Sequence, residues 1–233
     1  MYALIIAGGE GERLRPLTSD RPKAMIPVAG RPLVEHQLEW LRAGGVTDAV
    51  ILCGYRADVL QEHLGDGRRF GINVKYSAEA EPLGRGGALK QGFGFVPGGQ
   101  PFVIACNGDI LTNQPLAEVI RYHERKRAAA TVMLSPLRSP FGIVDVERDG
   151  RITEFREKPE LPYWINAGIY ILSPEFFQRL PEKGDHETTT FPELAAEGRL
   201  FGFKSRAYWR PVDSIKDLKE AERELQQLAR AGA

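Results

Sequence analysis

The chain has 233 residues, of which 42% are hydrophobic and 27% charged, and this size and composition predict one α/β domain with a substantial core. Lys plus Arg equals Asp plus Glu at 31 each, so no overall field attracts nucleic acid or an anionic membrane, and any phosphate must be bound by a local cluster. No apolar run approaches the length of a membrane span, and the amino terminus lacks the basic and apolar regions of a signal peptide.

In the first half of the chain, short apolar runs alternate with segments of helical periodicity. The predicted strands are 2–6, 49–53, 72–76 and 101–106, and the predicted helices are 32–44, 57–64, 86–92 and 115–127. A strand after each helix predicts an α/β, Rossmann-like doubly wound fold with a mostly parallel sheet and helices on both faces.

From about Ala130 the pattern changes. Strand-like segments at 131–134, 142–146, 152–157 and 167–172 follow one another closely, which predicts antiparallel additions in the second half. Thr190 and Ser214 begin segments with the hydroxyl-to-carboxyl spacing of a capping box, and a helix is predicted at the end of the chain. No internal repeat or composition break occurs, so we expect a single domain over 1–233 without an appended β-helix.

The cysteines and histidines are not expected to take part in catalysis. Cys53 and Cys106 end apolar strands and are expected to be buried thiols, which indicates a reducing, cytoplasmic compartment. The histidines are scattered, mostly in helix-like surface patterns, and none is expected to be catalytic: His36, His63, His123 and His186.

The loop after the first strand concentrates glycine and positive charge. Glycines at 8, 9 and 11 let the backbone approach an anion, and Lys23 follows a cluster of three arginines at 13, 15 and 21. The dinucleotide fingerprint would need a glycine at Leu14, and no Gly-Lys pair provides a P-loop. Glycine and charge alone would equally suit a solvated turn.

The wider sequence of this loop is more specific. Gly-Gly-x-Gly-x-Arg-Leu-x-Pro-Leu-Thr from Gly8 and Arg-Pro-Lys-x-Met-x-Pro-Val-x-Gly-x-Pro from Arg21 resemble the signature of the sugar-1-phosphate nucleotidyltransferases. The resemblance implies that the backbone at Ala7, Gly8, Gly9 and Gly11 cradles the nucleotide phosphates. It also implies that Arg13 and Lys23 are catalytic and neutralise the reacting phosphates, whereas Arg15 and Arg21 receive no separate role.

Further segments fit the same family in order. Glu79-Ala-Glu-Pro-Leu-Gly-Arg-Gly-Gly resembles the base-reading segment, with Glu79 and Gly84 at the nucleotide, and a carboxylate at Glu79 suits the two N–H donors of guanine. Arg85 replaces the small hydroxyl residue more usual there. The sugar phosphate is expected at positions that match the family's aromatic–glycine, Glu-Lys-Pro and Asn-x-Gly-Ile-Tyr segments: Gly142, Glu157, Lys158 and Asn166.

Two aspartates are expected to hold a magnesium ion. Asp109 follows a buried strand in Asn-Gly-Asp, where a hard oxygen ligand suits Mg²⁺ on a nucleotide. The last segment, Trp209-Arg-Pro-Val-Asp213, departs from the commoner Trp-x-Asp-Val-Gly and resembles the cytidylyltransferase form Trp-x-Pro-x-Asp. We assign the second ligand to Asp213, although an acidic residue before a helix is also favourable for the helix dipole.

The resemblance is closest to mannose- and heptose-1-phosphate guanylyltransferases, with a cytidylyltransferase-like last segment. It implies transfer of a nucleotidyl group from a nucleoside triphosphate, GTP first, to a sugar 1-phosphate with release of pyrophosphate. The phosphate nucleophile is already largely ionised near neutral pH, so no general base is needed. CTP, UTP or dTTP, and a non-catalytic sugar-nucleotide sensor, remain alternatives. The expected partners are these two substrates, without nucleic acid or membrane, and a homo-oligomer is left open.

Overall fold

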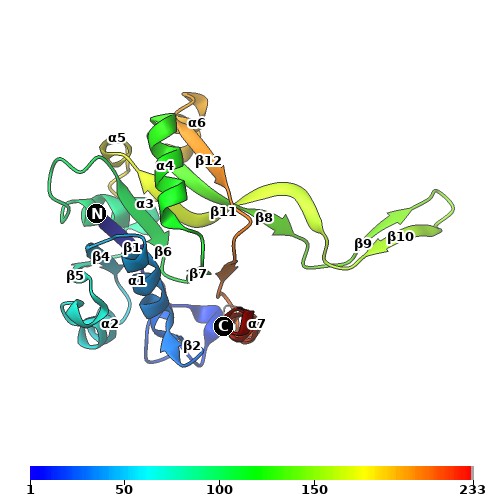
Figure 1. Cartoon of the computed structure of the whole chain (residues 1–233), viewed down its shortest axis with the longest axis horizontal. Helices are drawn as coiled ribbons and strands as arrows, with labels where there is room; N and C mark the ends of the chain where they lie inside the picture. The colour runs from blue at the N-terminus through cyan, green and yellow to red at the C-terminus, as the bar shows by residue number, and fades with distance from the viewer. Residues whose placement is uncertain (232–233) are drawn as a thin grey trace.

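The computed structural model describes residues 1–231, and a seven-stranded sheet runs through its centre (Figure 1). The strands lie in the order β12 (Leu200–Lys204), β8 (Ala130–Arg138), β11 (Glu160–Leu172), β6 (Val103–Asn107), β1 (Tyr2–Ile6), β4 (Asp48–Cys53) and β5 (Asn73–Ala78). The pairs among β6, β1, β4 and β5 are parallel, as is β12 with β8, whereas β11 is antiparallel to both of its neighbours. The predicted fold class, with its antiparallel additions, is confirmed.

Helices cover both faces of this sheet. Strand side chains alternate between the two faces, so Ile5 and Ile51 point into one core and Leu4 and Leu52 into the other. The first core is closed by α1 (Leu33–Ala43), α2 (Ala57–Leu64) and α4 (Leu116–Lys126). The second is closed by α3 (Gly84–Phe93), α5 (Pro174–Gln178) and α6 (Thr190–Ala196).

A third, smaller core joins the two ends of the chain. The terminal helix α7 (Ile215–Ala231) packs near β2 (Pro27–Val28), which pairs with β3 (Arg31–Pro32). Leu14 and Ile26 from the first loop pack there with Val212 and Ala221 from the last segment. The Gly-rich loop is therefore held against residues from the far end of the chain.

One segment leaves the body of the protein as an arm, which we define as residues 139–159. It carries the hairpin of β9 (Ile143–Val146) and β10 (Ile152–Arg156), which projects away from the sheet (Figure 1). Val144 pairs with Phe155 and Val146 with Ile152, so one face of the hairpin is apolar, and these side chains are 41–64% exposed. The Arg156–Asp145 ion pair lies on the arm as well.

Most local predictions are confirmed, and two are wrong. Both cysteines are buried and free, and Ser214 exchanges hydrogen bonds with Asp217 as a capping box. Thr190 forms no such cap, because its hydroxyl donates to the carbonyl of Arg179. The expectation of surface histidines also fails at two positions, since His123 is 4% and His186 0% exposed.

The two buried histidines predict a pH dependence of folding. Burial lowers the pKa of both His123 and His186 to about 4, from an ordinary value of 6.5. The unfolded chain therefore binds protons that the folded chain refuses, and their contribution to stability is full above pH 6.5 and is lost as the pH falls towards 4. Each histidine accounts for roughly 2 to 3 kcal/mol over that range.

His186→Leu should reduce this acid loss by one histidine. Both ring nitrogens of His186 lack a hydrogen-bond partner among the described residues, so the change leaves no partner orphaned. We expect the free energy of unfolding, measured by urea denaturation, to drop less between pH 7 and pH 4.5 in the variant. An equally steep drop in both proteins would contradict the assignment.

Candidate active site

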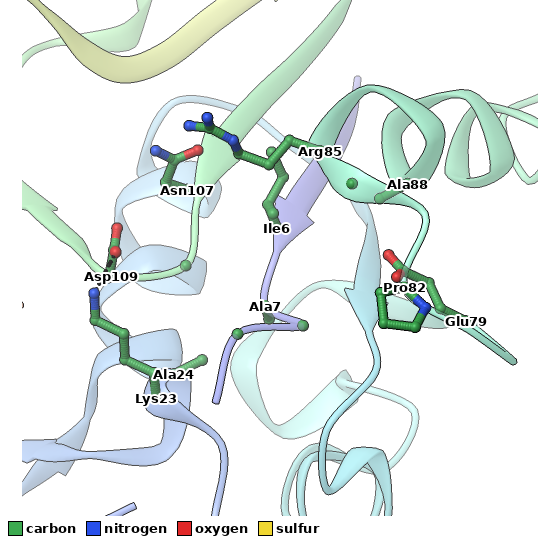
Figure 2. Close-up of a pocket in the computed structure, with 14 residues that line it drawn as sticks. Ile6, Ala7, Lys23, Ala24, Glu79, Pro82, Arg85, Ala88, Asn107 and Asp109 are labelled. Carbon is green, nitrogen blue, oxygen red and sulfur yellow. Dashed lines mark hydrogen bonds and ion pairs between the residues drawn. The ribbon is translucent and has the colours of Figure 1, made fainter. Parts of the chain in front are cut away.

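The Gly-rich loop lines a cleft of about 360 Å³ at the carboxyl end of β1. Ala7, Gly8 and Gly9 line it, and Figure 2 shows Lys23 at one side of Ala7. Gly11 lies outside the lining and has a φ of 66°. A Cβ at this position would come within 3.0 Å of the Lys23 side chain, so glycine leaves room for the lysine. The loop therefore has both a backbone surface and a cation at the cleft.

Two strand ends bring Asp109 and Asp213 together. Asp109 directly precedes β7 (Ile110–Thr112), and Asp213 is the second residue after β13 (Trp209–Pro211). These strands pair antiparallel, and the Val212 N–H donates to the Asp109 carbonyl at 2.9 Å. The two carboxylates consequently lie side by side although they are far apart in the sequence.

Lys23 lies between these carboxylates. Its Nζ is 2.6 Å from Asp109 Oδ2 and also donates to Asp213 Oδ1. The Lys23 side chain is 14% exposed, whereas the aspartates are 26% and 34% exposed and remain open to the cleft. Figure 2 shows the Lys23 amine directed at Asp109. One cation and two anions thus converge at one point.

This convergence fits a divalent cation. The ammonium of Lys23 marks a position that one oxygen of each aspartate can reach, and two carboxylates plus substrate phosphates are a common ligand set for Mg²⁺. Within residues 1–231 no group of three His, Cys, Asp or Glu side chains forms a metal cage. A metal here would therefore depend on the substrate for its remaining ligands.

The three arginines of the loop differ in position. Arg13 Nη2 lies 3.2 Å from Asp213 Oδ1, and its side chain is 74% exposed, free to turn towards a ligand. Arg15 pairs with Glu10 and Arg21 with Asp20, both on the outer surface of the loop. Only Arg13 therefore joins Lys23 at the aspartates.

The predicted base-reading segment forms the opposite side of the cleft. Glu79 and Gly84 both line it, and Figure 2 shows Glu79 and Pro82 across from Lys23. Glu79 Oε2 accepts the Leu83 N–H at 3.1 Å, which holds the carboxylate in place and leaves Oε1 available. Free cysteine does not take part, since burial raises the pKa of the Cys106 thiol to about 12.

A second cavity of about 640 Å³ adjoins the first, and the two share Arg85, Asn107 and Asp109. Asn166 lines it, and Asp213 forms part of its wall. The other predicted sugar-phosphate residues do not line either cavity. Gly142, Glu157 and Lys158 lie on the arm, where a Cβ on Gly142 would be 3.1 Å from Glu157 Oε2.

Comparison with known proteins shows the family of the chain. The family model described as nucleotidyl transferase matches residues 2–228, which is nearly the whole chain. The chain belongs to the nucleotidyl transferase family. Sequence reasoning named that family from the Gly8–Pro32 segment, and the match confirms it.

Relatives within the nucleotidyl transferase family carry related names. The chain is 33% identical over 231 residues to the mannose-1-phosphate guanylyltransferase of Mycobacterium tuberculosis, covering 96% of this chain and 64% of the relative. It is 36% identical over 225 residues to the mannose-1-phosphate guanyltransferase of Yarrowia lipolytica, covering 93% and 62%. The chain thus spans less than two thirds of the length of these relatives.

A solved structure supports the fold of this chain. The crystal structure of a candidate glucose-1-phosphate thymidylyltransferase from Bacillus anthracis aligns with a TM-score of 0.76 at 25% identity, over 96% of this chain and 94% of that one. The names of the relatives differ in base and sugar while the fold is shared.

The sequence analysis did not assign three residues of the cavities to the site: Arg85 and Asn107, which line both cavities, and Glu187, which lines the second. Asn107 has a buried side-chain oxygen without a partner among the described residues, and it lines both cavities. Arg85 was noted only as an unusual residue, and Glu187 was not noted. Asn107 precedes the recognised Asp109 by two residues, which was a usable signal, but Glu187 reaches Arg85 through tertiary packing alone.

Proposed function

We propose that this chain catalyses transfer of a nucleotidyl group, GTP being the favoured donor, to a sugar 1-phosphate. The observation that carries the proposal is the meeting of Lys23, Asp109 and Asp213 where the two cavities join. The first cavity has a Gly-rich floor suited to phosphates, and the second has polar side chains suited to hydroxyls. The names of the two mannose-1-phosphate guanylyltransferase relatives support the same reaction class.

The reaction needs positioned charge and no general base. A phosphate oxygen of the sugar 1-phosphate forms a bond to the α-phosphorus, and the bond from that phosphorus to the β-phosphate oxygen breaks, so pyrophosphate leaves with the electron pair. Lys23 and Arg13 neutralise charge on the transferring group and on the leaving pyrophosphate. The backbone at Ala7, Gly8 and Gly9 holds the nucleotide phosphates, with Gly11 shaping the path of Lys23.

Asp109 and Asp213 would hold the divalent metal, for which we propose Mg²⁺. When bound, the ion supplies charge neutralisation at the phosphates. Lys23 then exchanges the carboxylates for phosphate oxygens as its partners. Asn166 is proposed to contact a sugar hydroxyl, and Glu157 and Lys158, with Gly142, would reach the sugar phosphate only if the arm comes nearer to the second cavity.

GTP is favoured because Glu79 offers a carboxylate oxygen on the side of the cleft opposite Lys23. Guanine presents a ring N–H and an exocyclic amine on one edge, and a carboxylate accepts from both. CTP is the second candidate, because Pro211 stands where the commoner family form has aspartate, as in cytidylyltransferases.

The proposal is tested by pyrophosphate release. The purified chain with Mg²⁺ is incubated with mannose 1-phosphate and, in turn, GTP, CTP, UTP and dTTP. We expect the fastest release with GTP. Fastest release with CTP would show that the cytidylyltransferase-like segment Trp209–Asp213 indicates the base better than Glu79 does. No release with any triphosphate, tested with mannose, glucose, heptose and amino-sugar 1-phosphates, would favour the sugar-nucleotide sensor.

Two wider expectations are also proposals. The free buried thiols support a reducing compartment such as the cytoplasm. Assembly into a homo-oligomer is supported by the exposed apolar face of the arm, since isolated hairpins are marginally stable in water. Among the described residues, no helix is long and apolar enough to cross a membrane.

A further inference from the structure

Arg85 stands on the wall shared by the two cavities, on the first turn of α3 (Figure 2). Its backbone N–H and its Nε both donate to Asp185 Oδ1, at 3.1 and 2.9 Å. Its Nη2 lies 2.6 Å from Glu187 Oε2. Two carboxylates from one loop therefore fix the orientation of the guanidinium.

A buried side chain and backbone hydrogen bonds hold the loop that carries these carboxylates in place. His186, between them, is fully buried against aromatic rings, whereas Asp185 and Glu187 both contact Arg85. Gly184 donates to the Leu83 carbonyl at 2.7 Å and accepts from the Gly86 N–H at 2.8 Å. Gly84 has a φ of 74°, and a Cβ there would be 2.8 Å from the Gly184 oxygen. The start of α3 and this loop consequently form one rigid unit.

Glu187 extends the network to the predicted sugar residue. Its Oε1 accepts from Asn166 Nδ2 at 2.7 Å and from the Tyr170 hydroxyl at 3.2 Å. Glu187 lines the second cavity and is 25% exposed. Within residues 1–231, Oε2 accepts only from Arg85, and Arg85 Nη1 donates to no protein group. Both side chains thus retain hydrogen-bonding capacity at the wall of the cavity.

From this geometry we propose that Arg85 and Glu187 recognise the sugar ring in the second cavity. Glu187 Oε2 accepts a hydrogen bond from a ring hydroxyl, and Arg85 Nη1 donates to another oxygen of the same ring. Because Asp185 and Glu187 more than offset the charge of Arg85, the wall suits a neutral ring with free hydroxyls rather than a sugar with a second phosphate or a carboxylate. The inference rests on the proposed function and specifies its substrate class.

Binding constants test the proposal without requiring turnover. GDP-mannose and GDP are titrated into the whole chain and into Glu187→Gln, with the melting temperature measured to confirm folding. We expect the dissociation constant for GDP-mannose to rise roughly tenfold and that for GDP to stay within about twofold, since a hydrogen bond to a charged group is lost only at the sugar. The KM for mannose 1-phosphate should rise in parallel while the KM for GTP does not.

The matched control is Glu182→Gln, which alters an 88% exposed glutamate of the same loop and should change none of these constants. Glu187→Asp keeps the negative charge beside Arg85. If Glu187→Gln is poorly folded, Glu187→Asp is used in its place, and we expect its affinity for GDP-mannose to lie between those of Glu187→Gln and the unaltered chain. Equal effects on GDP-mannose and GDP, or no effect on either, would overturn the inference. A chain that releases no pyrophosphate but shows the same selective loss would instead contradict the proposed function alone.

Discussion

Asp109→Asn should lower turnover by roughly 10²- to 10³-fold while leaving the fold intact, because it removes one of the two anionic oxygens that meet at Lys23. An amide oxygen binds a divalent cation more weakly than a carboxylate, and its N–H donors cannot replace the lost charge. The measurement is pyrophosphate release at saturating triphosphate over a range of Mg²⁺ concentrations. The loss should be partly offset at high Mg²⁺ if Asp109 acts through the metal.

The control for this variant is Asp20→Asn, which changes an exposed aspartate of the Gly-rich loop that pairs with its neighbour Arg21 and lines neither cavity. It should keep full turnover. Normal turnover in Asp109→Asn would contradict the assignment of Asp109 as a metal ligand. A large drop in the melting temperature of the variant would indicate that Asp109 has a structural role instead.

Lys23→Ala should reduce turnover by a similar factor, since it removes the partly buried cation proposed to face the reacting phosphates. The structure also predicts that the melting temperature of this variant depends on the metal. Without Lys23, Asp109 loses its cation and Asp213 keeps only the exposed Arg13, so repulsion between the two carboxylates should lower the melting temperature of the variant in a chelator. Mg²⁺ should return the melting temperature close to that of the unaltered chain, because the ion occupies the position of the lost charge.

Arg21→Ala serves as the matched control, since it removes a cation of the same loop that lines neither cavity. Its turnover and its response to Mg²⁺ should match those of the unaltered chain. If melting of Lys23→Ala were lowered equally with and without Mg²⁺, the lysine would be holding the loop in place rather than serving the chemistry.

The sequence predicted the parts of the site that are local. The Gly8–Pro32 segment is continuous, so its glycines and Lys23 could be recognised together, and Asp109 follows directly from a buried strand. The position of Asp213 rested on resemblance, because the pairing of β7 with β13 that brings it to Asp109 joins distant segments. No periodicity in either strand indicates that register.

The position of the arm could not be predicted for a different reason. The strands at 142–146 and 152–157 were recognisable, but short strands of this kind pair equally well within a sheet or in a separate hairpin. Their departure from the body moves Glu157 and Lys158 away from both cavities. Glu187 lies in a loop held in place by Arg85 and by the burial of His186. The residues next to Glu187 in the sequence carry no pattern that predicts its contact with Arg85.

The Lys23–Asp213 contact, which spans 190 positions of the chain, has a consequence for biosynthesis. During translation the glycine loop and Asp109 emerge long before Asp213, so a nascent chain has the Gly-rich loop with only one of the two carboxylates that contact Lys23. The pair is complete only once β13 has paired with β7. A ligand that bridges the two aspartates should therefore bind only after these distant segments have folded together, and it should stabilise the chain as a whole.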